Sequence, residues 1–115
     1  MTFADAAPHV DRARRFGGVA RLYGVEGAAR IAQAHVAVVG LGGVGSWAAE
    51  ALARSGVGRL TLIDFDHVAE SNINRQILAT EQTLGQAKVA AMRERIATID
   101  PMTTVDTVDA FVEPD

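Results

Sequence analysis

The feature that most constrains the fold is a glycine-rich run at the end of an apolar segment. Residues 35–40 (HVAVVG) are typical of a short strand that is buried on both faces of a parallel sheet. After this strand, we expect Gly40 to permit a tight turn and Gly45 to allow close helix–strand packing. Between them, Gly42 and Gly43 would let the backbone approach a phosphate beside the amide donors of a helix N-terminus. The run therefore predicts a phosphate-binding loop, with a merely tight turn as the alternative.

A helix is predicted directly after the glycines, because apolar residues recur there at helical spacing until Ser55–Gly56. The stripe consists of Val44, Trp47, Ala48, Ala51 and Leu52. We expect this stripe to face the core, and we interpret Trp47 as a core residue in preference to a base-stacking platform.

Two more strands and one more helix complete the pattern. Residues 60–64 (LTLID) and 103–108 have the composition of strands. The second helix is expected to begin at a capping box of Thr83 and Gln86 and to end before Asp100–Pro101. Residues 65–80 are polar and irregular, so they are a candidate functional loop.

The order strand–helix–strand–helix–strand predicts an α/β fold with a parallel sheet and right-handed crossovers. This is a Rossmann-like βαβαβ unit, one mononucleotide-binding half of a doubly wound fold. Residues 1–34 are interpreted as an N-terminal helical arm and residues 35–115 as the nucleotide-binding domain. Only three strands are predicted, so we expect the sheet to be truncated at its C-terminal side.

Composition excludes several classes of function. The chain of 115 residues has no Cys, which rules out a disulfide scaffold, a thiolate zinc site and a cysteine nucleophile within it, and which fits the cytoplasm. A net charge of -3 argues against a broad basic surface for nucleic acid. No apolar run is long enough to span a membrane. We assign no metal ligands, because the His residues have no spacing that suggests a ligand set.

An acidic residue lies where a nucleotide-binding fold needs one. Asp64 ends the second predicted strand, nineteen residues after Gly45, about where such folds place the carboxylate that accepts hydrogen bonds from ribose hydroxyls. Asp66 is the competing candidate, although it already lies in the following turn. The position at the strand end favours Asp64.

Two cations extend the site beyond what a dinucleotide requires. Arg75 could bind phosphate oxygens with two hydrogen bonds, and Lys88, the single Lys of this chain, could add a compact charge near a helix N-terminus. Asn72 and Asn74 could donate neutral hydrogen bonds to ribose or phosphate. Together they suit a triphosphate. Alternatively, the Asn residues cap turns and Arg75 pairs with Glu70.

Four ordered motifs carry a family resemblance. They are GLGGVGS at 40–46, LIDFD at 62–66, SNINRQ at 71–76 and GQAK at 85–88. The chain resembles, over residues 12–114, the adenylating domain of the ubiquitin-activating-enzyme-like superfamily, to which the ThiF, MoeB and HesA proteins belong. Two longer strings, RFGGVARLYG at 15–24 and GSWAAEALARSG at 45–56, are most similar to those of the tRNA threonylcarbamoyladenosine dehydratases.

The resemblance implies an ATP site that is built from Gly43, Asp64, Asn72, Arg75 and Lys88. It also implies a homodimer in which an N-terminal Arg reaches the ATP of the partner. Gly18 stands at the position where the family pattern has that Arg, so Arg15 or Arg21 would have to substitute. The family's Mg²⁺-binding Asp is expected beyond residue 115.

The activity implied by the resemblance is ATP-dependent adenylation of the threonyl carboxylate of tRNA threonylcarbamoyladenosine, followed by cyclisation with loss of AMP. In that reaction Arg75 and Lys88 would stabilise the departing pyrophosphate. The alternative is adenylation of the C-terminal Gly of a ubiquitin-like sulfur-carrier protein, and a third reading is an NAD(P)-dependent dehydrogenase. We expect these 115 residues alone to be inactive, and they could also serve only as a dimerisation and recognition module.

Overall fold

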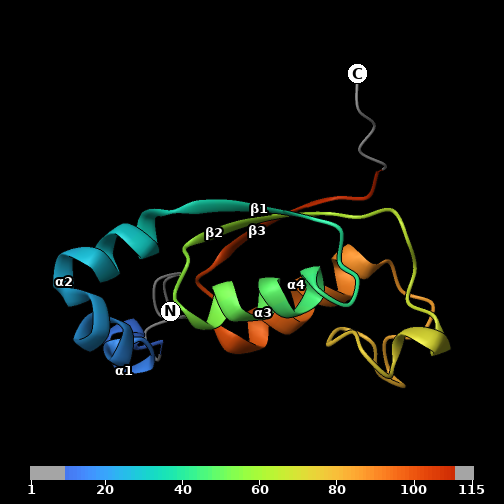
Figure 1. The fold of residues 1–115 in the computed structure, drawn as a ribbon, viewed down its shortest axis with the longest axis horizontal. Helices are drawn as coiled ribbons and strands as arrows, with labels where there is room; N and C mark the ends of the chain where they lie inside the picture. Colours follow the sequence, from blue (N-terminus) through green and yellow to red (C-terminus); the bar gives the residue numbers. More distant parts are fainter. Residues whose placement is uncertain (1–9, 111–115) are drawn as a thin grey trace, which may run out of the picture.

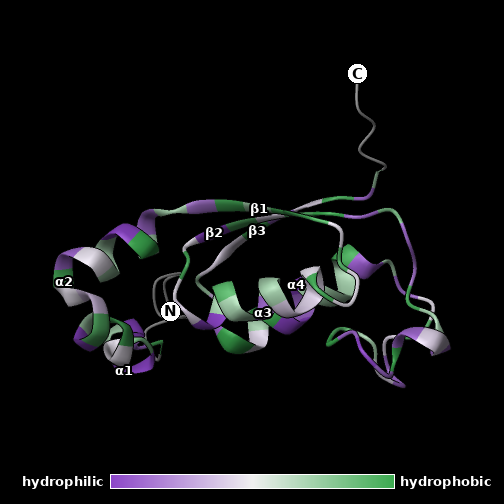
Figure 2. Ribbon diagram, viewed as in Figure 1, coloured by the Kyte–Doolittle hydropathy of each residue, from purple (hydrophilic) through white to green (hydrophobic). Residues whose placement is uncertain are grey.

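Three parallel strands form the sheet that positions the glycine-rich loop. The computed structural model describes residues 10–110, in which β1 (His35–Val39), β2 (Arg59–Ile63) and β3 (Thr104–Val108) pair in the order β1-β2-β3. Both pairs are parallel, and the register places Leu60 beside Val36 on one side and Val105 on the other. β1 is hydrophobic along most of its length (Figure 2), but the prediction that it is buried on both faces is wrong, because Val38 is buried whereas Ala37 and Val39 are exposed. The predicted Rossmann-like α/β fold is confirmed.

Two helices cover one face of this sheet. α3 (Gly45–Arg54) and α4 (Lys88–Ile99) lie on the same side (Figure 1), where they pack against the strands and against each other. The core between these layers contains the fully buried Leu41, Leu60, Leu62, Met92 and Ile96. No helix of residues 10–110 covers the opposite face, where Val39 is 62% exposed.

The helical arm precedes the sheet. α1 (Arg12–Arg15) and α2 (Gly17–Gln33) lie at the amino ends of the strands (Figure 1), and α2 is interrupted at Gly24. Arg12 fastens the arm to the domain, because its guanidinium pairs with the fully buried carboxylate of Asp100 and donates to the Gly56 carbonyl at 3.0 Å. None of the helices in the described part of the chain is long and apolar enough to cross a membrane.

The polar connection between β2 and α4 is irregular, as predicted, apart from the 3-10 helix η2 (Glu70–Asn72). Its two ends meet in an isolated antiparallel bridge between His67 and Ala87. Val68 donates to the Gln86 carbonyl at 2.8 Å beside this bridge. The bridge returns the start of α4 to the end of β2.

The predicted orientation of α3 is wrong. Its buried residues are Ser46, Ala49, Glu50 and Ala53, whereas Val44 is 84% and Trp47 52% exposed. Small side chains face the sheet because they let the helix approach it closely, which a row containing Trp and Val would prevent. Trp47 is therefore not a core residue.

The predicted capping box is also absent. α4 begins at Lys88 with Ala87 as its N-cap, and no side chain caps it. Thr83 instead stabilises a turn, because its hydroxyl donates to the Leu78 carbonyl at 2.7 Å and accepts from the Thr80 amide at 2.8 Å. Because α4 begins only at Lys88, Thr83 lies too far before it to cap its first amides, and its hydroxyl closes the local turn instead.

Candidate nucleotide-binding site

The glycine-rich loop needs two of its glycines for its own geometry. Gly40 has a φ of 88°, in the left-handed region, while its amide donates to the Ile63 carbonyl at 2.8 Å. A Cβ on Gly45 would lie 1.8 Å from the Gly40 carbonyl oxygen. The tight turn expected at Gly40 and the close packing expected at Gly45 are both present.

The other two glycines are not required by the chain itself. A Cβ on Gly42 would lie 3.9 Å from Gln76 Nε2, and one on Gly43 would lie 3.6 Å from Arg75 Cγ and Cδ, which are ordinary contacts. Neither glycine has a positive φ. The lack of a Cβ at these positions leaves the backbone amides accessible to a group that must approach closely, such as a phosphate at the N-terminus of α3, with the Arg75 side chain next to it.

Asp64 is joined to this loop. Its Oδ2 accepts a hydrogen bond from the Leu41 amide at 2.7 Å, and its Oδ1 accepts from the Asp66 amide at 2.7 Å. Each carboxylate oxygen keeps a further lone pair, so ribose hydroxyls could still donate to it. Asp66 has an exposed side chain, and its backbone carbonyl accepts from the Lys88 amide at 3.0 Å. Of the two acids, Asp64 is the one whose carboxylate contacts the glycine-rich loop.

Lys88 is buried without a counter-ion. It is the first residue of α4 and only 6% exposed, and its side chain has no ion pair or hydrogen bond with any residue of 10–110. The Lys88 ammonium is not among the fully buried atoms that lack a partner, so it keeps contact with solvent, but the partial positive charge of the helix N-terminus repels it. A bound anion would offset this repulsion.

Arg75 lies beside Gly43 of the glycine-rich loop. Its Nη1 donates to the Ser71 carbonyl at 2.8 Å and to Asn74 Oδ1 at 3.2 Å, so its own loop orients the guanidinium. Among the described residues it forms no ion pair with Glu70. Asn72 is buried, and its Oδ1 accepts from the Ala69 amide at 2.8 Å, which is the turn-capping role considered as an alternative.

Three residues next to the loop were not predicted to belong to the site. Ser46 is fully buried and donates to the Gly42 carbonyl at 2.6 Å. Trp47 Nε1 donates to the Arg75 carbonyl at 2.7 Å. Gln76 is 4% exposed, and its buried Oε1 has no hydrogen-bond partner. Helical periodicity assigned Trp47 to the core, and nothing in the sequence distinguishes Ser46 or Gln76 from ordinary polar residues.

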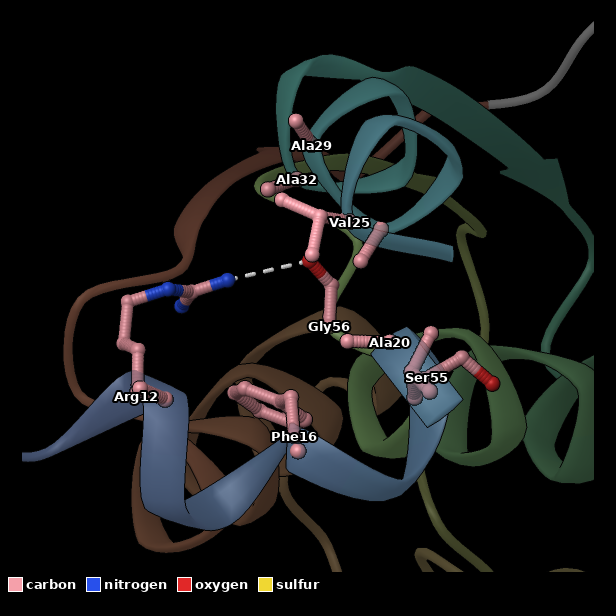
Figure 3. Close-up of a pocket in the computed structure, with 12 residues that line it drawn as sticks. Arg12, Phe16, Ala20, Val25, Ala29, Ala32, Ser55 and Gly56 are labelled. Atoms are coloured by element: carbon pink, nitrogen blue, oxygen red, sulfur yellow. Dashed lines mark hydrogen bonds between the residues drawn. The ribbon is translucent and has the colours of Figure 1, made fainter. Parts of the chain in front are cut away.

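These residues converge at the carboxyl ends of β1 and β2, where doubly wound folds bind nucleotides (Figure 1). The glycine backbone, Arg75 and Lys88 fit a phosphate-bearing ligand, whereas the Gln76 oxygen, which only accepts, needs a donor such as a ribose hydroxyl. Within residues 10–110 no three His, Asp or Glu side chains gather into a metal site. A separate apolar cavity of about 360 Å³ lies between the arm and the end of α3, lined in part by Phe16 and Val25 (Figure 3), away from these groups.

Comparison with known proteins places this site in a family. The ThiF family model matches residues 16–115. The chain belongs to the ThiF family. Among curated relatives of this ThiF-family chain, the tRNA threonylcarbamoyladenosine dehydratase of Escherichia coli is 57% identical over 102 residues, which are 89% of this chain and 38% of the relative. The molybdopterin-synthase adenylyltransferase of Salmonella typhimurium is 44% identical over 84% of this chain and 39% of its own length.

The solved structures agree with these relatives. The Escherichia coli tRNA N6-threonylcarbamoyladenosine dehydratase in complex with ATP matches with a TM-score of 0.86 and 56% identity, over 87% of this chain and 41% of that one. The chain thus spans about two fifths of the length of the proteins that it matches.

Proposed function

We propose that this chain supplies the ATP site of a tRNA-modifying dehydratase. The complete enzyme would adenylate the threonyl carboxylate of tRNA threonylcarbamoyladenosine and drive its cyclisation. The observation that carries the proposal is that the glycine-rich loop, with Arg75 beside Gly43, is joined through Asp64 and Asp66 to Lys88 at the start of α4. The likeness to the ATP-bound Escherichia coli dehydratase supports the choice of nucleotide.

Different residues would bind different parts of the nucleotide. Asp64 would accept hydrogen bonds from the ribose hydroxyls, and Asn72 and Asn74 would donate amide hydrogens to ribose or phosphate. The loop from Gly40 to Gly45 would hold phosphate oxygens at the N-terminus of α3.

ATP supplies the adenylyl group that activates the substrate carboxylate. Arg75 and Lys88 would then hold charge at the outer phosphates as the pyrophosphate departs. Such electrostatic stabilisation requires no nucleophile from this chain, which has no Cys. Mg²⁺ is part of the proposal only through ligands outside residues 10–110, since Asp64 and Asp66 do not make a complete set.

The proposal includes a homodimer in the cytoplasm, where tRNA is modified. Of the two arginines that could reach a partner's ATP, we favour Arg21. Arg15 Nη1 already donates to the Ile99 carbonyl at 2.9 Å, whereas the Arg21 guanidinium lies near Gly17 and Gly18 without a hydrogen bond to any described residue. Arg21→Ala should weaken ATP binding by the full-length dimer and leave the monomeric chain unchanged.

The 44% identity to a molybdopterin-synthase adenylyltransferase supports a second candidate, adenylation of a sulfur-carrier protein. The deciding experiment gives the full-length protein ATP, Mg²⁺ and either tRNA threonylcarbamoyladenosine or a carrier with a C-terminal Gly-Gly. We expect AMP release and the cyclic nucleoside with the tRNA. Pyrophosphate exchange that depends on the carrier and not on the tRNA would contradict the proposal.

A further inference from the structure

Trp47 is an exposed aromatic residue with a specific polar contact. It lies in the first turn of α3, its ring is 52% exposed, and its Nε1 donates to the Arg75 carbonyl at 2.7 Å. Burial in the core therefore does not explain a large aromatic side chain here. The contact joins the helix that follows the glycine-rich loop to a segment 28 residues further along the chain.

Leu78 and Ala79 bury the end of the segment that carries Arg75 in the core, but its other polar contacts are mainly with its own residues. The Arg75 amide donates to the Asn72 carbonyl at 3.1 Å, and the guanidinium donates to Ser71 and Asn74. These bonds fix the shape of the segment but not its position relative to the glycine-rich loop. The carboxamide oxygen of Gln76 has no hydrogen-bond partner.

Only two hydrogen bonds connect residues 75–77 to α3 in the described part of the chain. One is the indole bond of Trp47, and the other is the longer bond from the Ile77 amide to Ser46 Oγ, at 3.4 Å. A hydrogen bond of 2.7 Å is strong, whereas one of 3.4 Å is near the limit of an effective contact. The indole N–H is therefore the main polar constraint on the distance between Arg75 and Gly43.

We propose that Trp47 is a positioning residue, which holds Arg75 beside the glycine-rich loop so that its guanidinium reaches the phosphates of the nucleotide. This inference rests on the proposed ATP site. It assigns the indole N–H, and not the aromatic ring, as the group that matters. It also makes Trp47 act through Arg75 and not by contact with the nucleotide.

The test is a double-mutant cycle on ATP binding, measured by calorimetry with wild type, Trp47→Phe, Arg75→Ala and the double variant. Trp47→Phe keeps an aromatic ring and removes the donor, so we expect ATP to bind about five- to tenfold more weakly. In the Arg75→Ala background the same change should alter the affinity less than about twofold, because the group that Trp47 positions is gone. Equal losses in both backgrounds, or no loss in either, would overturn the proposal.

A second measurement needs no nucleotide. Amide hydrogen exchange at residues 73–77 should be about fivefold faster in Trp47→Phe than in wild type, because the segment opens more easily. Tyr23→Phe is the matched control, since it removes a polar group from another exposed ring, 62% exposed, on the arm. Unchanged exchange in Trp47→Phe would refute the positioning role. Absence of ATP binding by the wild-type chain would instead refute the proposed function.

Discussion

Replacing Lys88 by Met should stabilise the nucleotide-free chain and weaken its ATP binding. Lys88 has no counter-ion among residues 10–110 and lies at the first position of α4, so the folded state carries an uncompensated charge at the positive end of a helix. Met has a similar length and helix propensity but no charge. Removing the charge should contribute about 0.3–1 kcal/mol of stability. For a domain of this size, that raises the unfolding midpoint by roughly 1–4 °C.

The effect on binding should have the opposite sign. Loss of a charge-assisted hydrogen bond to phosphate costs about 1.5–3 kcal/mol, which is roughly a 10- to 150-fold weaker affinity for ATP. AMP should lose less than about threefold, because it lacks the outer phosphates that we assign to Lys88. Thermal unfolding without nucleotide and calorimetric titration with ATP and AMP measure both effects.

Arg93→Met is the matched control, because Arg93 lies on the same helix with an exposed side chain. It should change stability by less than about 0.5 kcal/mol and leave both affinities unchanged. A Lys88→Met variant that is less stable than wild type would refute the idea that the charge at the start of α4 destabilises the nucleotide-free chain. Equal losses for ATP and AMP would show that Lys88 does not bind the outer phosphates.

Three further predictions concern the loop, the helix pair and the arm. Gly43→Ala should keep the unfolding midpoint within about 2–4 °C of wild type but lose most ATP affinity. Gly45→Ala should unfold the domain, because its Cβ would overlap the Gly40 carbonyl. Circular dichroism distinguishes the folded Gly43 variant from the unfolded Gly45 variant. Burial raises the pKa of the Glu50 carboxyl, but hydrogen bonds and charge from Arg95 and Arg54 outweigh it, so the pKa lies below its ordinary value. The stability that the Glu50 carboxylate contributes is therefore present above about pH 4.3 and is lost as the pH falls through the folded-state pKa. Glu50→Gln should lower the free energy of unfolding by about 1–2 kcal/mol at pH 7 and weaken the dependence of stability on pH in acid. Asp100→Asn should lower the free energy of unfolding by about 3–5 kcal/mol, because Arg12 loses its charged partner, and it should accelerate proteolysis of α1. An unchanged rate of cleavage would mean that other contacts hold the arm.

The order of strands and helices could be predicted because each strand is a short apolar run and the glycines mark the turn between β1 and α3. The position of Asp64 beside the loop also follows from that order, since the carboxyl ends of parallel strands share one edge. The face that α3 buries could not be predicted. Its stripe with Trp47 satisfies helical periodicity, yet the face that α3 buries carries the small Ser46, Ala49 and Ala53 together with Glu50.

The long loop was the least predictable part of the site. Composition indicates that residues 65–80 are irregular, but a polar sequence does not specify which of many turns forms. The capping role of Asn72 is a local contact with the Ala69 amide, which a polar sequence allows but does not require, whereas the burial of Gln76 beside Gly42 involves residues far apart in the sequence. The burial of Lys88 could not be predicted either, because the bridge that returns the start of α4 to the end of β2 joins His67 to Ala87, which are far apart in the sequence.

The most direct test of an ATP site in this chain is thermal protection by nucleotides. ATP, AMP and NAD would each be added at the same millimolar concentration, and the unfolding midpoint would be followed for wild type and for Gly43→Ala. We predict that ATP raises the midpoint of wild type most, AMP less and NAD least, and that Gly43→Ala loses the ATP effect. A midpoint raised by NAD and unmoved by ATP would contradict the proposed site.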